Sequence, residues 1–453
     1  TDGPRWLAGD HHIHSRYSVG WNRDASPPAP IIAGDAIYPI GMNAAMARYY
    51  GLSWVVATDH GGPQHSKVNF DLAYPELVQS RQVVPEVVQF AGLELDTPGA
   101  DHSSMILPRT SDEAERRRDL EARFDRVEPW PADPGRDSEA LMLEALQVMD
   151  TLSPRPVIIA NHPSRSATDT GVYGATSPEE LRNWNDTAPG VAVGMAGAPG
   201  HQAKTLDREG RRREGPRGSY SNSPTLGGFD QMAARVGGFW DAMLGEGRHW
   251  WITANSDSHI NWREGGSDFW PGEFSKTYVW AEKSYDGILE GLRHGHIFVT
   301  TGDLISELYV TASAAGVEAN IGSTVAMQAG ADVVVTIRFR DPRATNSHGD
   351  DPAVTRVDLI TGLVAGGDAG PASGTDPNTN PSTKVIARFG PGAWKTEGDY
   401  HTVTHTLRDL HTNMYLRVRG TNGTEQEPEQ DPIGENPWTD LWFYSNPVFL
   451  EVR

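Results

Sequence analysis

The 453-residue chain contains no cysteine. Without thiols it can form no disulfide, no thiolate nucleophile and no Cys-ligated zinc site. This absence is compatible with an oxidising compartment. The sequence also begins at Thr1 rather than at Met, as it does when a leader has been removed. We therefore expect a periplasmic or secreted protein, with a cytoplasmic location as the alternative.

Long hydrophobic runs and positive charge are also scarce. No run of 18 apolar residues occurs, so we expect no membrane span. The 39 Lys and Arg residues face 60 Asp and Glu residues, which gives a formal charge of −21. Such a charge repels nucleic acid and anionic membranes at long range, although a local cationic pocket could still hold an anion. We expect no nucleic acid polymer as a partner; equally, the acidity could serve solubility alone.

Apolar content is sufficient for large cores, at 38% hydrophobic residues with 14 Trp. From Trp6 to about Thr301, apolar runs typical of strands alternate with segments of helical spacing, which predicts a parallel sheet. About seven such units indicate a closed or nearly closed barrel. The predicted strands are Trp6–His14, Trp54–Thr58, Val87–Glu94, Ser103–Leu107, Val157–Asn161, Val191–Met195 and Trp250–Asn255. The predicted helices are Gly41–Tyr50, Asp112–Arg126, Glu139–Thr151, Pro178–Trp184 and Phe229–Leu244.

The periodicity changes after residue 302. Val333, Val335, Ile337 and Phe339 alternate with other residues, which is a period of two and predicts strands of a β-sandwich-like domain. The fold class is therefore α/β, with a barrel over residues 1–302 and a C-terminal β domain over residues 303–453. Two loops rich in Gly, Pro, Asn and acids, 366–383 and 421–438, are predicted to be mobile connections rather than calcium sites, because their acids lack the alternation of an EF-hand loop.

Histidines and acids recur where the apolar runs end. Because side chains at i and i+2 of a strand point to one face, His12 with His14 and Asp257 with His259 form same-side pairs. Converging imidazoles and carboxylates are what a cluster of divalent metals needs. The predicted metal ligands are His12, His14, His60, Glu94, His102, His162, Asp257 and His259.

Each of these residues also has an ordinary structural interpretation. One His of a His-x-His can cap or pack, and His162 can be a buried, hydrogen-bonded histidine. Glu94 is either a ligand or the partner of a nearby Arg, since a lone buried carboxylate is costly. Asp59 is either a ligand or a hydrogen-bond partner that orients an imidazole, and we favour the second. His102 opens its apolar run instead of ending it.

Taken together, these motifs resemble the PHP metallohydrolase family, named for its polymerase and histidinol phosphatase members. The resemblance rests on His12-Ile13-His14, Thr58-Asp59-His60, Glu94, His162 and Asp257-Ser258-His259. It implies a distorted (β/α)7 barrel. Many members carry an Asp or His just after the Ser that follows the His-x-His, whereas Ser18 is followed here by Val19 and Gly20. One ligand is thereby missing.

Further motifs are similar to a subgroup of larger PHP hydrolases that includes carbaryl hydrolases, in which a C-terminal β domain follows the barrel. They are Ala198-Pro199-Gly200-His201, 296–302, 415–420 and 444–447.

The mixed nitrogen and oxygen ligand set favours two Mn, Zn or Fe ions, with a third left open. A hydroxide that bridges the two ions would be the nucleophile. We predict Asp257 and His201 as catalytic residues, and Arg165, His201 and Lys204 as residues that bind substrate. The expected activity is a metal-dependent phosphoesterase that hydrolyses small organic phosphodiesters, with a small-molecule ester as partner and an undetermined oligomeric state. The alternatives are hydrolysis of carbamates or carboxylic esters at the same centre, and a non-catalytic, metal-stabilised binding protein.

Overall fold

A computed structural model describes residues 2–365 and 376–453 of the chain. Its N-terminal half is built on seven strands, in the segments that the apolar runs predict. They are β1 (Arg5–Ile13), β4 (Trp54–Ala57), β5 (Val88–Asp96), β6 (His102–Ile106), β7 (Val157–Asn161), β8 (Ala192–Ala198) and β9 (Trp251–Ala254). A small hairpin of β2 (Gly20–Asn22) and β3 (Ala29–Ile31) projects between β1 and the first helix.

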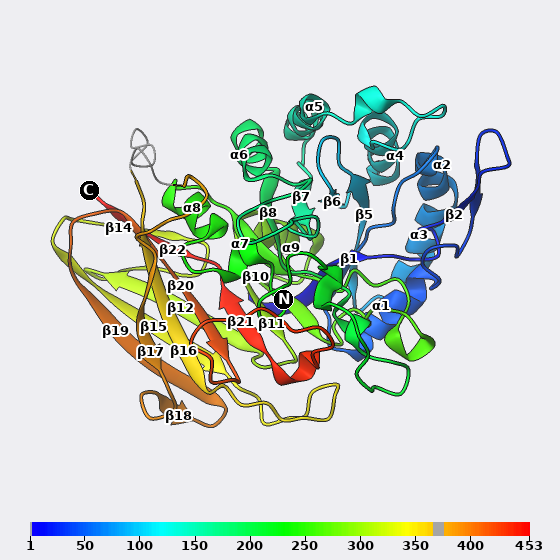
Figure 1. Cartoon of the computed structure of the whole chain (residues 1–453). Helices are drawn as coiled ribbons and strands as arrows, with labels where there is room; N and C mark the ends of the chain where they lie inside the picture. The colour runs from blue at the N-terminus through cyan, green and yellow to red at the C-terminus, as the bar shows by residue number, and fades with distance from the viewer. Residues whose placement is uncertain (1, 366–375) are drawn as a thin grey trace.

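These seven strands follow one another in the order β1-β4-β5-β6-β7-β8-β9 (Figure 1). Neighbours are parallel except at β6, which is antiparallel to both β5 and β7. The prediction of a uniform βα repeat is therefore wrong at β6, because the short turn from Thr97 to Asp101 leaves no room for a crossover helix. Just beyond the strand ends, an isolated parallel bridge joins Ile13 to Ser258. The ends of the first and last strands thus lie side by side.

Helices cover the outside of this strand arc, and Figure 1 shows α1 to α4 on the side of the molecule away from the C-terminal strands. The helices are α1 (Ile40–Tyr49), α2 (His65–Val68), α3 (Tyr74–Val83), α4 (Glu113–Phe124), α5 (Glu139–Thr151), α6 (Pro178–Thr187), α7 (Gln231–Ala234), α8 (Phe239–Gly245) and α9 (Tyr285–Arg293). The predicted helix at 229–244 is broken into α7 and α8. The chain becomes extended at Arg235, where α7 ends, and Gly237 with a left-handed φ of 77° turns it before α8 begins.

Short helical turns complete the connections. A π-helical turn, η1 (Asn69–Ala73), joins α2 to α3. The 3-10 turns are η2 (Pro134–Arg136), η3 (Gln202–Thr205), η4 (Arg217–Ser219), η5 (Trp262–Glu264) and η6 (Pro437–Thr439).

Two strands that were not predicted, β10 (Ser275–Ala281) and β11 (Ile297–Thr301), follow β9. After residue 302 the described chain is made mostly of strands, as the period of two predicts. They are β12 (Glu307–Ala314), β13 (Val317–Ala319), β14 (Thr324–Met327), β15 (Ala331–Arg340), β16 (Arg356–Leu363), β17 (Lys384–Phe389), β18 (Lys395–Glu397), β19 (Tyr400–Leu410), β20 (Met414–Thr421), β21 (Trp442–Ser445) and β22 (Val448–Val452). The sheet β13-β12-β15-β19-β18 shares a hydrophobic core with strands such as β16 and β20. In β15, Val333, Val335, Ile337 and Phe339 are buried and alternate with more exposed residues.

One long sheet connects the two halves. Strand β11 pairs with β21, so hydrogen bonding continues from β1 through β10 and β11 into β21, β20, β22 and β14. The α/β class is therefore confirmed. A domain boundary at residues 302 and 303 stays a prediction, and residues 366–375 of the predicted 366–383 connection lie outside the described residues.

The side chain of His65 links the segment after His60 to α4 and to Tyr17. It is fully buried, with Nδ1 2.6 Å from Oε2 of Glu121 on α4 and Nε2 2.7 Å from the carbonyl oxygen of Tyr17. Because both partners accept hydrogen bonds, the doubly protonated ring suits this place. Burial lowers the pKa of His65, but Glu121 raises it more, to a net value of about 8.

We expect the variant His65→Gln to lose stability in a pH-dependent way. A folded-state pKa above the ordinary 6.5 gives stability that is fully present below pH 6.5 and is lost as the pH rises through about 8. The destabilisation should therefore be larger at pH 6 than at pH 9, by about 2 kcal/mol. Urea unfolding at the two pH values measures it. The exposed His411→Gln is the matched control, and an equal loss at both pH values would contradict the assignment.

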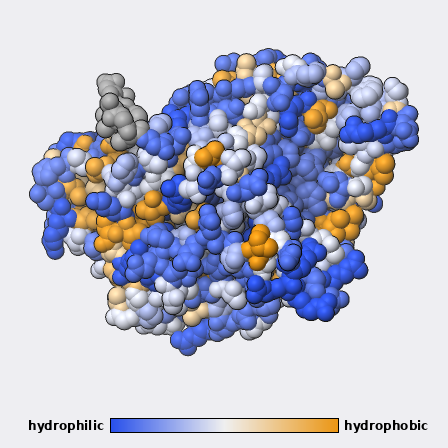
Figure 2. All heavy atoms as spheres, in the orientation of Figure 1, coloured by the Kyte–Doolittle hydropathy of each residue, from blue (hydrophilic) through white to orange (hydrophobic). Residues whose placement is uncertain are grey.

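The surface is mostly hydrophilic, as the many charged residues in the sequence lead us to expect. Hydrophilic residues cover most of the face seen in Figure 2, and hydrophobic residues form small separate groups on it. Among the described residues, no helix is long and apolar enough to cross a membrane.

Candidate metal centre

The predicted ligands lie together at the ends of the strands. His12 is in β1 and His14 follows it, Glu94 is near the end of β5, His102 begins β6, and His162 follows β7. The reversed direction of β6 explains why His102 begins its strand, since the start of an antiparallel strand lies beside the ends of its neighbours. The structure thus brings together residues that are up to about 250 positions apart in the sequence.

Three residues at this edge adopt a left-handed backbone that is uncommon for any residue other than glycine. His162, His201 and Asp257 have φ values of 30°, 59° and 48°. Such conformations carry strain of about 1–3 kcal/mol each, and they persist where the surrounding structure enforces them. Three such residues around one cluster indicate that the surrounding structure fixes the directions of their side chains.

The first group of donors consists of His12, His14, Glu94 and Asp257, all buried. Oδ1 of Asp257 lies 3.0 Å from Nε2 of both His12 and His14, and these two nitrogens are 3.0 Å apart. Nε2 of His12 also contacts Oε2 of Glu94. Ligand atoms about 2.1 Å from a common cation are about 3.0–3.4 Å apart in octahedral or tetrahedral arrangements. The spacing of this group suits a divalent ion.

The second group shares Glu94 with the first. Nδ1 of His102 lies 3.1 Å from Oε1 of Glu94, and Nε2 of His162 lies 3.9 Å from Oε2. Both nitrogens, and Oδ1 of Asp257, are buried atoms that have no hydrogen-bond partner. Because such atoms are costly unless they are paired, they fit cation ligands better than structural polar groups. Glu94 therefore stands between two sets of imidazoles.

Other residues hold the imidazoles of His14, His102 and His162 by their remaining nitrogens, whereas the buried Nδ1 of His12 has no hydrogen-bond partner. Nδ1 of His14 lies 2.8 Å from Oγ of Ser18, which in turn donates to Asp59. The favoured role of Asp59, orienting an imidazole, is thus met through Ser18. Nε2 of His102 lies 3.1 Å from Asp96, and Nδ1 of His162 lies 3.2 Å from Asp101. A carboxylate behind a ligating histidine fixes its tautomer and raises its basicity.

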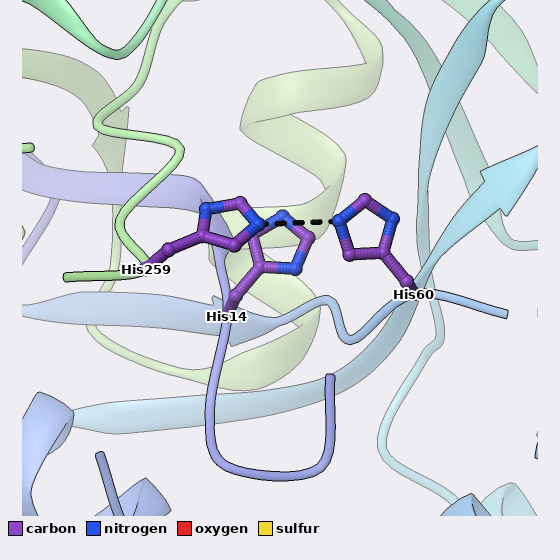
Figure 3. Close-up of side chains that lie close together, drawn as sticks. All are labelled: His14, His60 and His259. Carbon is purple, nitrogen blue, oxygen red and sulfur yellow. Dashed lines mark hydrogen bonds between the residues drawn. The ribbon is translucent and has the colours of Figure 1, made fainter. Parts of the chain in front are cut away.

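His201 and His259 belong to a third group at the same edge. Figure 3 shows the rings of His14, His60 and His259 close together, and Nε2 of His60 lies 3.2 Å from Nε2 of His259. Nε2 of His201 lies 2.8 Å from Oδ2 of Asp257, and its Nδ1 contacts Asp268. Asp268 also accepts the backbone N–H groups of His259 and Ile260.

Three acids of this site were not predicted from the sequence: Asp96, Asp101 and Asp268. Their only sequence signal is closeness to Glu94, His102 and His259, which is too general to distinguish them from surface acids.

The carboxylates of Glu94 and Asp257 carry negative charge that bound cations would balance. Burial raises the pKa of Glu94 and of Asp257, but neighbouring imidazoles lower it more, so both carboxyls have a pKa well below the ordinary value. Burial lowers the pKa of His12, but Asp257 and Glu94 raise it to about 10. Protons on imidazoles thus balance the two carboxylates when no other cation does. Divalent ions would displace these protons, so the donor set and its charge both fit the metals that the sequence predicts.

A cavity of about 330 Å³ opens above the donors. His60, Glu94, His201, Asp257 and His259 line it, and so does Arg165. Arg165 pairs with Asp101, with Nη2 2.6 Å from Oδ1 and Nε 3.1 Å from Oδ2. Lys204, which we predicted to bind substrate, is not among the described residues that line this cavity, because it lies on η3 beside Gly215.

Comparisons with known proteins identify no family for this chain. No family profile matches it, and no curated protein matches it. A solved structure of Endonuclease Q, in complex with a 27-mer duplex carrying an abasic lesion at the active site, is similar with a TM-score of 0.31 and 14% identity over 64% of this chain. The match spans only 56% of the length of that protein. A similarity of this size carries no conclusion about activity, and both the PHP family and the carbaryl-hydrolase subgroup stay predictions.

One expectation from the sequence is corrected here. We excluded nucleic acid polymers, yet the similar solved structure is a complex with duplex DNA. The exclusion was based on the net charge of −21, which averages over the whole surface, whereas a polyanion contacts only the groove that binds it. The exclusion is therefore withdrawn.

Proposed function

We propose that this protein is a metal-dependent phosphodiesterase. The observation that carries the proposal is the position of Glu94, a buried carboxylate shared by two groups of imidazoles at the floor of an open cavity. Two divalent ions, when bound, supply the Lewis acidity that activates water and stabilises charge on an ester oxygen. Mn, Zn or Fe suits the mixed nitrogen and oxygen donors.

In this proposal the side chains have separate roles. His12, His14, Glu94 and Asp257 hold one ion, and Glu94, His102 and His162 hold the other. His201, fixed at Nδ1 by Asp268, hydrogen bonds to Asp257 through Nε2 and faces the cavity. From this place it can hold a proton at Nε2 for the oxygen of the leaving group. Arg165 faces the same cavity and binds a non-bridging oxygen of the substrate.

The charges around the cavity favour a diester over a monoester. Among the described residues that line it, Arg165 is the only Arg or Lys, whereas Asp35, Glu94, Asp257 and Asp268 are acids. A monoester dianion needs more positive charge than one guanidinium that already pairs with Asp101. A diester carries a single negative charge, which this lining accommodates better.

A substrate panel tests the proposal. After chelation and addition of Mn²⁺ or Zn²⁺, we expect turnover of bis(p-nitrophenyl) phosphate to exceed that of p-nitrophenyl phosphate and of 1-naphthyl methylcarbamate. End-labelled single-stranded and duplex oligonucleotides test polymeric diesters in the same assay. Preferred turnover of the carbamate would favour the alternative hydrolase. Absence of turnover of every substrate by metal-loaded protein would favour a binding protein.

We expect Arg165→Ala to raise KM for bis(p-nitrophenyl) phosphate by about 10-fold to 100-fold, because a hydrogen bond to a charged group contributes about 1.5–3 kcal/mol. Metal content should stay unchanged, since Arg165 is not a donor in the groups described above. Steady-state kinetics and metal analysis measure the two quantities. Arg118→Ala, which removes an exposed pair with Asp119, is the control. An unchanged KM would show that Arg165 only supports Asp101.

A further inference from the structure

His11 lies inside the strand arc, directly before the proposed ligand His12. Successive side chains of a regular strand point to opposite faces, whereas the rings of His11 and His12 are nearly parallel, at 18°, with centroids 6.4 Å apart. The register of β1 with β4 shifts between Asp10 and Ile13, which marks an irregularity of the bulge type. Bulges redirect side chains and are common beside active sites. This one leaves a second, fully buried histidine next to the metal groups.

A chain of four hydrogen bonds runs through His11 and ends on Glu94. Oγ1 of Thr253 lies 2.7 Å from Nε2 of His11, and Nδ1 of His11 lies 3.1 Å from Oγ of Ser104. Oγ of Ser104 lies 3.1 Å from Oδ1 of Asn161, whose Nδ2 lies 3.0 Å from Oε2 of Glu94. The five residues belong to β9, β1, β6, β7 and β5, and all are buried. The chain therefore crosses the interior of the strand arc.

The charge of Glu94 fixes the direction of each hydrogen bond in this chain. A carboxylate only accepts, so Asn161 donates through Nδ2, and its Oδ1 accepts from Ser104. The single hydroxyl proton of Ser104 is then used, so Nδ1 of His11 must donate to Ser104. Both partners of His11 are hydroxyls, which cannot balance a buried positive charge. Its ring is therefore neutral, and Nε2 accepts from Thr253.

The amide of Asn161 orients the carboxylate of Glu94. Oε2 of Glu94 accepts from Asn161 and contacts Nε2 of His12, whereas Oε1 faces Nδ1 of His102 at 3.1 Å. Each oxygen thus faces a different group of imidazoles, and a turn of the carboxylate would misdirect both oxygens. The hydrogen bond from Ser104 keeps the amide of Asn161 from turning over, because a reversed amide would place two acceptors against each other at Glu94.

We infer that His11 is a positioning residue of the metal centre, which acts through Ser104 and Asn161 to orient Glu94. The inference rests on the proposed function, in which two ions share Glu94. His11 supplies the proton on Nδ1 that leaves Ser104 free to donate toward Asn161. Replacement of a residue that supports a metal ligand typically lowers metal affinity by about 10-fold to 100-fold.

The test is the affinity for Mn²⁺, which isothermal titration calorimetry of chelator-stripped protein measures without any turnover. His11→Phe keeps a planar ring but removes both hydrogen bonds, and we expect it to weaken Mn²⁺ binding by about 10-fold. His11→Asn places an amide N–H where Nδ1 stands, so it should bind Mn²⁺ more tightly than His11→Phe. His65→Phe is the matched control, because it also removes two hydrogen bonds from a fully buried histidine but should leave the Mn²⁺ affinity unchanged.

A double-mutant cycle tests whether His11 acts through the hydrogen-bond chain. Asn161→Leu removes the donor to Glu94 and should weaken Mn²⁺ binding at least as much as His11→Phe. Because both changes break one chain, the variant that carries both should bind no more weakly than Asn161→Leu alone. Losses that multiply would show that His11 acts independently of Asn161, and would overturn the inference. Ser104→Ala, which breaks the chain by removing one oxygen, takes the place of either variant if it fails to fold.

The outcomes separate this inference from the proposed function. Unchanged Mn²⁺ affinity in His11→Phe would overturn the positioning role and leave the two-ion centre intact. Absence of bound Mn²⁺ in the unaltered protein would overturn the proposed function itself. Urea unfolding accompanies each titration, and we expect both His11→Phe and His65→Phe to lose stability but His11→Phe alone to lose affinity. An equal loss of affinity in His65→Phe would trace the effect to general destabilisation and would also overturn the inference.

Discussion

Replacement of Glu94 by Gln is expected to remove metal from both principal groups and to lower kcat/KM by about 10³-fold or more. The substitution keeps the shape of the side chain but removes the negative charge and one of two oxygens that face His12, His60 and His102. Metal assistance contributes several kcal/mol to the lowering of a hydrolytic barrier, and each 1.36 kcal/mol is a factor of ten in rate. Hydrolysis of bis(p-nitrophenyl) phosphate and metal analysis of the purified variant measure the two effects.

A buried glutamate outside the site provides the control. Glu113 on α4 is also fully buried and pairs with Arg81. Glu113→Gln should lose some stability but keep its metal, because its carboxylate lies outside the donor groups. Retention of full metal content and activity by Glu94→Gln would show that Glu94 is a structural carboxylate, balanced by protonated imidazoles alone.

The positions of the strands could be predicted because each apolar run is short and ends at a polar motif. Strand direction could not. The run at Ser103–Leu107 has the same composition whether it is parallel or antiparallel, and only the short turn before His102 contains the relevant information. The interrupted helix at 229–244 shows a similar limit. The apolar spacing continues through Gly237. Only the folded structure shows that this residue has a left-handed backbone and that α7 and α8 pack as separate helices.

The residues that we propose as ligands could be singled out in the sequence, whereas the residues that support them could not. His12, His14 and Glu94 interrupt apolar runs at which a polar residue needs an explanation. Asp101 and Asp268 lie in loops, where acids are common, and their contacts with His162 and His201 arise only in the folded chain. Asp35 is a further case, because it follows the β2–β3 hairpin and comes close to His60 and His259 only in the folded chain. Sequence spacing alone contains no signal for such a contact.

The second large effect is expected outside the lining of the cavity, where α8 packs on β20. Asp241 accepts from Nε and Nη2 of Arg417 at 3.0 and 2.8 Å, and from the hydroxyl of Tyr415 at 2.9 Å, with all three residues fully buried. Nη1 of Arg417 already has no hydrogen-bond partner. Asp241→Ala would leave a buried guanidinium without its counter-charge. We expect a loss of about 3–5 kcal/mol in the free energy of unfolding, measured by urea denaturation.

Two comparisons distinguish a charge effect from a simple loss of contacts. Asp332→Ala removes an exposed pair with Arg408 and should change stability by less than about 0.5 kcal/mol. The double variant Asp241→Leu with Arg417→Met removes both charges and fills most of the same volume, so it should recover most of the lost stability. A double variant as unstable as Asp241→Ala would mean that the hydrogen bonds to Tyr415 and Gly237, rather than charge balance, hold α8 against the C-terminal strands.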